Sequence, residues 1–131
     1  MMHRTALADR ITEVKASTLT FGGHSVNLWT WERPVTGYMV SLKASEQVVP
    51  LETFRRLGQS ILTAYIHRHR EVIDANVGTA RELHLGTWVD GGDVYIDLSV
   101  NVLDRPSAEA LAREEHQKTY YDLYIGKSIN V

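Results

Sequence analysis

Residues 83–103, LHLGTWVDGGDVYIDLSVNVL, decide the fold of this chain. The stretch contains two runs in which apolar and polar residues alternate, joined by Asp90-Gly91-Gly92-Asp93. Glycine reaches the positive φ angles that tight turns require, so the pattern predicts an antiparallel β-hairpin. The turn residues are either Gly91-Gly92 or Asp90-Gly91. The two alternatives differ by two residues in the pairing of the strands, so every side chain stays on the same face.

The two faces of this hairpin differ in character. We expect one face to be core and the other to be half polar, because the side-chain period of a strand is two. The expected core face carries Leu83, Leu85, Thr87, Val89, Val94, Ile96, Leu98 and Val100, and the other face carries His84, Gly86, Trp88, Tyr95, Asp97 and Ser99.

Helical periodicity occurs in three places. The longest pattern covers residues 51–74 after Pro50, with apolar residues three and four positions apart. Residues 5–15 predict a shorter amphipathic helix, with a strand over residues 11–14 as the alternative. A third helix is expected to end near residue 116 and to begin at Asp104-Arg105-Pro106-Ser107, where either Asp104 or Ser107 can cap it and proline is tolerated in the first turn.

The remaining segments predict strands. Residues 17–21 and 26–31 flank Gly22-Gly23 and indicate a first hairpin, residues 38–42 another strand, and residues 120–125 a final one before a short tail. Hairpins joined by helices favour an α+β fold. We therefore expect a mainly antiparallel sheet of about five or six strands with about three helices, the longest packed on one face.

Composition sets limits on the class of protein. A length of 131 residues predicts a single domain, 1–131, and 44% hydrophobic with 23% charged residues is typical of globular proteins. A formal net charge of −2 makes nucleic acid an unfavoured partner. The absence of cysteine, of a signal-like opening and of any long apolar stretch leads us to expect a cytoplasmic protein that does not bind a membrane.

Two groups of residues are candidates for metal or acid–base chemistry. His67 and His69 point in different directions on a helix, whereas His67 and Glu71 share a face and could act with His84. Asp90, Asp93 and Asp97 could hold a hard cation, although Asp-Gly pairs are ordinary turn residues. We expect no metal site and no cofactor, because the ligand spacings are irregular and no nucleotide or nucleophile motif is present.

Aromatic residues are the remaining signal. Several are expected on strands but off the apolar face, where they could anchor a protein partner, stack on bases or simply pack under helices. The candidate interaction surface consists of Trp29, Trp31, Trp88, Tyr95, Tyr120, Tyr121 and Tyr124.

Part of the chain resembles a family of small uncharacterised proteins encoded on bacterial phages and integrated mobile elements. The resemblance covers about residues 37–129 and implies a genetic setting, with no activity, cofactor or catalytic residue to carry over. It is carried by Gly37-Tyr38-Met39-Val40-Ser41, Val49-Pro50, Ala64-Tyr65-Ile66 with Arg70, Leu85-Gly86-Thr87-Trp88-Val89-Asp90, Val94-Tyr95-Ile96-Asp97, Asp104-Arg105 and Tyr121-Asp122-Leu123.

We therefore expect a small intracellular interaction protein, an accessory or host-modulating factor of a phage or mobile element that acts by protein–protein binding. The alternative is a small metal-dependent hydrolase or other enzyme that uses His67, Glu71 and His84 with Asp90 and Asp93. Self-association is also expected, because residues 17–21 and 120–125 lack the usual protections of an edge strand. The expected homodimer buries Tyr120, Tyr121 or Tyr124.

Overall fold

A seven-stranded antiparallel sheet forms the centre of the computed structural model, which describes residues 4–131. The strands follow the order β1-β4-β5-β2-β6-β7, and β3 pairs with β5 beside β2. The expected α+β fold is confirmed, with a slightly larger sheet. The strands are β1 Gly23–Asn27, β2 Tyr38–Ser41, β3 Gln47–Pro50, β4 Leu83–Asp90, β5 Asp93–Val102, β6 Thr119–Asp122 and β7 Lys127–Asn130, and the helices are α1 Arg4–Phe21, α2 Leu51–Arg68, α3 Arg70–Ala75 and α4 Arg105–Glu114.

The β4–β5 hairpin has the expected turn and register. Asp90 stands opposite Asp93, so Gly91 and Gly92 are the turn residues, with φ angles of +58° and +85°. Side chains of the expected core face are buried, except Val89 near the hairpin tip, which is partly buried: Leu85 and Ile96 are fully inaccessible to solvent. The alternation in the sequence therefore predicted both the turn and the faces of the central hairpin.

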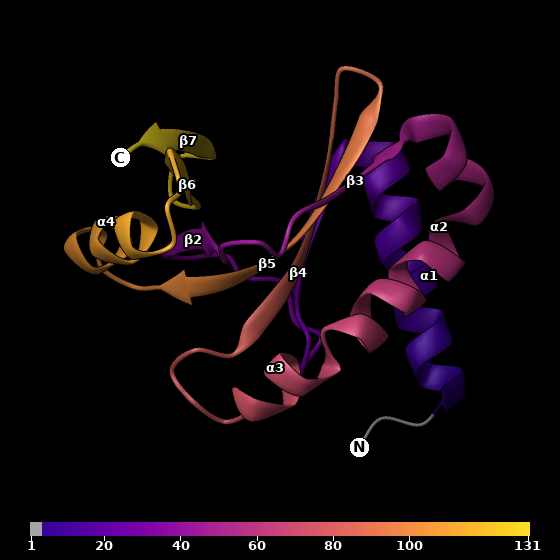
Figure 1. Ribbon diagram of the computed structural model, residues 1–131, viewed down its shortest axis with the longest axis horizontal. Helices are drawn as coiled ribbons and strands as arrows, with labels where there is room; N and C mark the ends of the chain where they lie inside the picture. The colour runs from indigo at the N-terminus through magenta and orange to yellow at the C-terminus, as the bar shows by residue number, and fades with distance from the viewer. Residues whose placement is uncertain (1–3) are drawn as a thin grey trace.

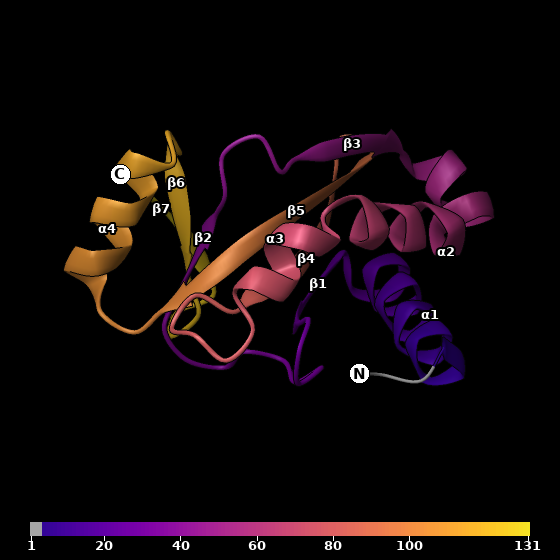
Figure 2. The ribbon, with the colours of Figure 1, turned by 60° about the horizontal axis from the view of Figure 1, so that its bottom comes forward.

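The helices pack on the apolar face of the sheet. Figures 1 and 2 show α1, α2 and α3 together against the long β4–β5 hairpin, and α4 at the other end beside β2 and β6. Buried residues of α1, α2, α3 and α4 belong to one hydrophobic cluster with this face of β4 and β5. No helix within residues 4–131 has the length and apolar character that a membrane-spanning segment needs.

The first hairpin predicted from the sequence is wrong. Residues 17–21 continue α1 instead of forming a strand, because Thr18 is buried and its hydroxyl donates a hydrogen bond to the carbonyl of Val14 while contacting the Thr87 hydroxyl. Gly22, with φ +82°, ends the helix and its N–H donates to the carbonyl of Thr18. The strand expected over residues 26–31 ends at Asn27, whose side-chain oxygen accepts the N–H groups of Trp29 and Thr30.

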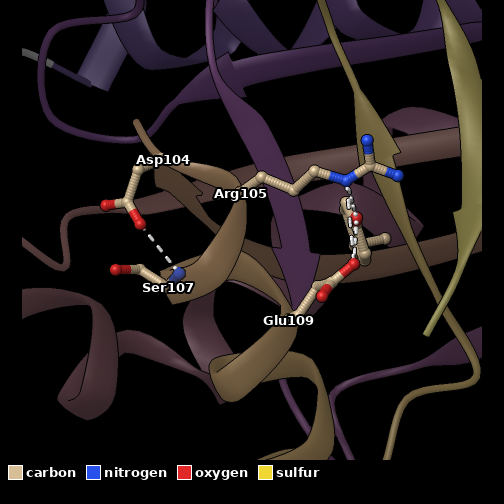
Figure 3. Close-up of polar contacts among 5 residues, drawn as sticks. Asp104, Arg105, Ser107 and Glu109 are labelled. Carbon is tan, nitrogen blue, oxygen red and sulfur yellow. Dashed lines mark hydrogen bonds and ion pairs between the residues drawn. The ribbon is translucent and has the colours of Figure 1, made fainter.

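The helices predicted over residues 51–74 and from Asp104 to about residue 116 are confirmed with one modification. The helix expected over residues 51–74 is interrupted at His69, which has φ −100° and ψ 10°, so it is divided into α2 and α3. Asp104 rather than Ser107 caps α4: its carboxylate accepts the N–H of Ser107 at 2.8 Å (Figure 3). Pro106 lies in the first turn, where its missing N–H costs nothing.

The C-terminal segment forms two strands instead of one. β6 covers Thr119–Asp122, and the expected tail contains β7, which pairs with β6. Because β6 lies between β2 and β7, it is not an edge strand, and residues 17–21 are helical. Both segments expected at the edge of the sheet were therefore assigned wrongly, and the path instead ends at β1 and β7.

Residues 42–46 interrupt the ladder between β2 and β3, both of which pair with β5. Ser45 fills the gap, because its hydroxyl accepts the N–H of Leu98 at 3.1 Å and donates to the carbonyl of Leu42 at 2.8 Å. The buried hydroxyl of Tyr65 donates to the Ser45 carbonyl at 2.6 Å. A side chain therefore replaces a backbone group in the middle of the sheet, and α2 holds it in place.

Candidate functional site

The face of the sheet opposite the helices is hollowed. A cavity of about 610 Å³ lies over it, lined by residues of β1, β2, β4, β5, β6 and β7 and of the loops between them. Because strands from both ends of the sheet contribute to the lining, this face is concave. We call the cavity the open-face hollow and define it by Ser41, Glu46, Trp88, Tyr95, Asp97 and Tyr121.

Asp97 is the polar centre of the open-face hollow. Its Oδ2 atom accepts a hydrogen bond of 2.6 Å from the hydroxyl of Ser41 on the neighbouring strand β2. Gly86 stands opposite Asp97 on β4, and a Cβ atom at that position would lie 2.5 Å from Oδ1 of Asp97. The carboxyl group therefore occupies space that only a glycine leaves free.

The environment of Asp97 disfavours its negative charge. Burial raises the pKa of the Asp97 carboxyl, and although the hydrogen bond from Ser41 acts in the opposite direction, the negative charge of Glu46 raises the pKa further. A carboxyl group with a raised pKa in a concave site is a typical feature of binding and catalytic sites.

Aromatic side chains stand next to this carboxyl group. Trp88 and Tyr95 are cross-strand neighbours whose rings meet edge to face, with 6.4 Å between centroids and 77° between planes. Trp88 is 50% exposed and Tyr121, on β6, is 38% exposed. The hollow thus combines one partly buried carboxyl group with aromatic surface that the protein leaves in contact with water.

The remaining aromatic residues of the predicted surface lie elsewhere. Trp29 is 53% exposed in the turn after β1, and Trp31, with φ +60°, packs against the core. Tyr124 is exposed in the turn between β6 and β7, where its ring meets that of Tyr38 edge to face. The structure therefore brings Trp88, Tyr95 and Tyr121 to one hollow and leaves Trp29, Trp31 and Tyr124 outside it.

Tyr120 belongs to the core, since it is only 2% exposed. Its hydroxyl accepts a hydrogen bond from Nε of Arg105 at 3.0 Å and donates one to the carboxylate of Glu109 at 2.9 Å. Figure 3 shows the side chains of Arg105 and Glu109, both on α4. Burial and the hydrogen bond to Glu109 raise the pKa of Tyr120, which fixes α4 to β6 and is not available to a partner.

The residues proposed for metal or acid–base chemistry do not come together. His67 precedes the helix break at His69 and Glu71 follows it, and both residues are exposed. His84 is buried in β4, about 20 Å along the strand from Asp90 at the hairpin tip. Within residues 4–131 no group of three or more His, Asp or Glu side chains is placed to hold a metal ion.

A second cavity of about 610 Å³ lies where residues 30–36, residues 79–82 and the start of α4 meet. Of its polar groups, the Glu82 carboxylate already has structural partners: it accepts the side-chain amide of Asn27 at 3.2 Å and the N–H of Gly78 at 2.8 Å. The buried Nδ1 atom of His84 has no hydrogen-bond partner within residues 4–131. His84 also lines it, and burial lowers the pKa of that imidazole. This cavity lacks the combination of carboxyl group and exposed aromatic rings found in the open-face hollow.

Sequence reasoning missed the partners of Asp97. The alternation in β5 placed Asp97 on the correct face, but Ser41 lies 56 residues earlier in the chain and Glu46 belongs to the break between β2 and β3. One signal was present, because the expected hairpin register already sets Gly86 opposite Asp97. A glycine in the middle of a strand, between Leu85 and Thr87, indicates a close approach by another group, here the side chain of Asp97.

No protein-family model, curated protein or solved structure matches this chain. The site is therefore interpreted from its own geometry, in which a hydrogen-bonded carboxyl group and aromatic rings converge in a concavity. That combination is typical of binding sites, where apolar walls supply affinity and a few polar groups orient the ligand.

Proposed function

We propose that this chain is a small interaction protein that binds a segment of a protein partner in the open-face hollow. One observation carries the proposal: the helices cover only one face of the sheet, and the other is concave with partly exposed Trp88 and Tyr121 at its surface. Tryptophan and tyrosine in a concave centre are the residues that most often dominate the energy of protein interfaces.

The remaining exposure of these rings gives the physical reason for binding. A partner that covers Trp88 and Tyr121 removes apolar surface from water, at about 25 cal/mol for each Å². A volume of about 610 Å³ lies within the range of sites that enclose small ligands or the anchoring side chains of a peptide. The hollow therefore has the size and character to hold a few side chains of a partner.

The resemblance to proteins of phages and mobile elements adds a setting to this proposal: an accessory factor in the bacterial cytoplasm whose partner is a host protein. Binding of this kind needs no cofactor. The alternative, a hydrolase that uses His67, Glu71 and His84 with Asp90 and Asp93, has no observation in its favour, because these side chains lie apart.

The test is capture of partners from a bacterial lysate with the immobilised chain and two matched variants. Trp88→Ala combined with Tyr121→Ala removes aromatic surface inside the hollow, whereas Trp29→Ala combined with Tyr124→Ala removes comparably exposed rings outside it. We expect a specific protein to be recovered by the wild type and the outside variant and lost with the hollow variant. Equal recovery by both variants would contradict the proposal.

Light scattering behind a sizing column decides whether the partner is a second copy of this chain. A mass near 14.8 kDa across a tenfold dilution at micromolar concentration excludes self-association through the hollow. A dimer that dissociates in the Trp88→Ala, Tyr121→Ala variant would identify a second copy as the occupant.

A further inference from the structure

We infer that the open-face hollow recognises a positively charged side chain of its partner, an arginine or a lysine, through the carboxyl group of Asp97. This inference rests on the proposed function and names the chemistry of the group that enters the site. It follows from the geometry around Asp97, from the charges that line the hollow and from the aromatic rings beside it.

The Asp97 carboxyl lacks a cation. Among residues 4–131 none of the ion pairs involves Asp97, and its hydrogen-bond partner is the neutral hydroxyl of Ser41. The charged group that acts on its pKa is the carboxylate of Glu46, which is also negative. A buried charge without an opposite charge destabilises a protein, so a cation from outside would be bound favourably.

Arg33 does not supply that cation. It is the only arginine or lysine among the described residues that line the hollow, and its charge lowers the pKa of His24 on β1. The charges facing the Asp97 side of the hollow are thus negative, from β5 and from the loop before β3. A partner with an acidic group would be repelled there, whereas a basic one would be attracted.

The sheet is built to hold this carboxyl group in the hollow. Ser41 binds Oδ2, and Oδ1 extends over Gly86, where a Cβ atom would lie only 2.5 Å away. The two strands that flank β5 therefore fix the carboxyl group. β2 supplies the Ser41 hydroxyl as a hydrogen-bond donor, and β4 leaves room for the group because Gly86 has no side chain. A fixed carboxylate with a free oxygen suits the parallel N–H groups of a guanidinium or the N–H groups of an ammonium.

The aromatic pair completes the site. Tyr95 is the next residue on the same face of β5, about 7 Å from Asp97 along the strand, and Trp88 stands opposite Tyr95. A cation bound to Asp97 therefore lies within reach of these rings, whose faces attract positive charge. The apolar stem of an arginine or lysine would cover the exposed part of Trp88.

The experiment is an NMR titration of the full chain with two five-residue peptides of glycine that carry either arginine or its neutral isostere citrulline at the centre. We expect the arginine peptide to shift the signals of Gly86, Trp88 and Tyr95 and to bind at least about tenfold more tightly than the citrulline peptide. Asp97→Asn, which keeps the shape of the side chain, should abolish this difference. Asp90→Asn, at the exposed hairpin tip, should preserve it.

Equal affinity of the two peptides for the wild type, absence of binding by either, or a preference that survives in Asp97→Asn would each overturn the inference. The comparison of the two peptides requires no variant, so it stands even if Asp97→Asn folds poorly. The proposed function fails on a separate result, the loss of any dependence of lysate capture on Trp88 and Tyr121. If lysate capture depends on Trp88 and Tyr121 but the two peptides bind equally, the proposed function stands and the inference of a positively charged ligand is wrong.

Discussion

The two faces of the β4–β5 hairpin are made from alternate residues of the same strands, yet they differ in almost every physical property. Leu85, Ile96 and Leu98 on the helix-covered face are at most 1% exposed and belong to the hydrophobic cluster under the helices. Gly86 and Asp97, one position away on the open face, hold a carboxyl group against a strand backbone in a cavity. The difference teaches that a single hairpin can separate the residues that form the core from those that line an open cavity.

The largest expected effect lies on the helix-covered face. Ile96→Ala removes a fully buried side chain and should lower the free energy of unfolding by about 2 to 5 kcal/mol in urea denaturation, because a cavity remains under the helices. Asp97→Ala, on the open face, should cost much less, since it removes one hydrogen bond from Ser41 and also an unfavourable buried charge. Similar losses for the two variants would break the comparison between the faces.

A smaller effect is expected from Trp88→Ala on the open face. Because Trp88 is half exposed, its main contribution to stability is the edge-to-face contact with Tyr95, worth about 1 kcal/mol. The same denaturation experiment measures it, with Trp29→Ala as the control for an exposed tryptophan without such a neighbour. A loss as large as that of Ile96→Ala would show that the open face is part of the core.

The next prediction concerns the fit between Gly86 and Asp97. Gly86→Ala should destabilise the protein by about 0.5 kcal/mol, because the new methyl group displaces the Asp97 carboxyl from Ser41 while alanine gains from its lower unfolded entropy. In an Asp97→Ala background the same substitution should become stabilising. If its effect is identical in both backgrounds, the two residues do not interact.

The smallest effect depends on pH. Burial lowers the pKa of His84, while the backbone of Glu82 and Ser99 acts in the opposite direction. Because the folded pKa lies below the unfolded value of 6.5, the unfolded chain binds more protons, and stability present above that value falls as the pH decreases below it. The drop in unfolding free energy between pH 7 and pH 5 should therefore be smaller in His84→Gln than in the wild type.

Titration of Asp97 changes the stability with pH in the direction opposite to His84, and this provides the control for the pH experiment. Its pKa is raised, so the folded protein binds a proton more readily than the unfolded chain, and its unfavourable charge is relieved as the pH falls through the folded pKa. The difference caused by His84→Gln should persist in an Asp97→Asn background, where this second titration is absent. Its disappearance there would assign the pH dependence to the hollow instead of to the histidine.

Much of the fold could be predicted from the sequence because it depends on patterns among neighbouring residues. Alternating residues around Gly91-Gly92 determine the hairpin and its faces, and spacings of three and four residues indicate α2. Residues 17–21 misled the prediction because threonine and phenylalanine favour strands, whereas packing of Thr18 against Thr87 keeps the segment in α1. Tertiary contact outweighed intrinsic preference there, and no local pattern reveals such a contact.

The candidate site was only partly accessible to sequence reasoning. Trp88, Tyr95 and Tyr121 were included in the expected surface, the first two because they lie off the apolar face of the hairpin and the third because it lies on the last predicted strand. Their separation from Trp29 and Tyr124 required knowledge of where β1 and β6 end. The hydrogen bond between Ser41 and Asp97 depends on the pairing of β2 with β5, which brings together residues that the sequence holds far apart.

The hydroxyl of Ser45, which replaces a backbone group beside β5, has a consequence for hydrogen exchange. The amide proton of Leu98, at the centre of the longest strand, is protected by a side chain whose position depends on Tyr65 in α2. Opening of residues 42–46 would expose that amide and would at the same time displace Ser41 and Glu46 from the hollow. The exchange rate of one amide in the core thus reports how often the open face of the sheet loses its shape.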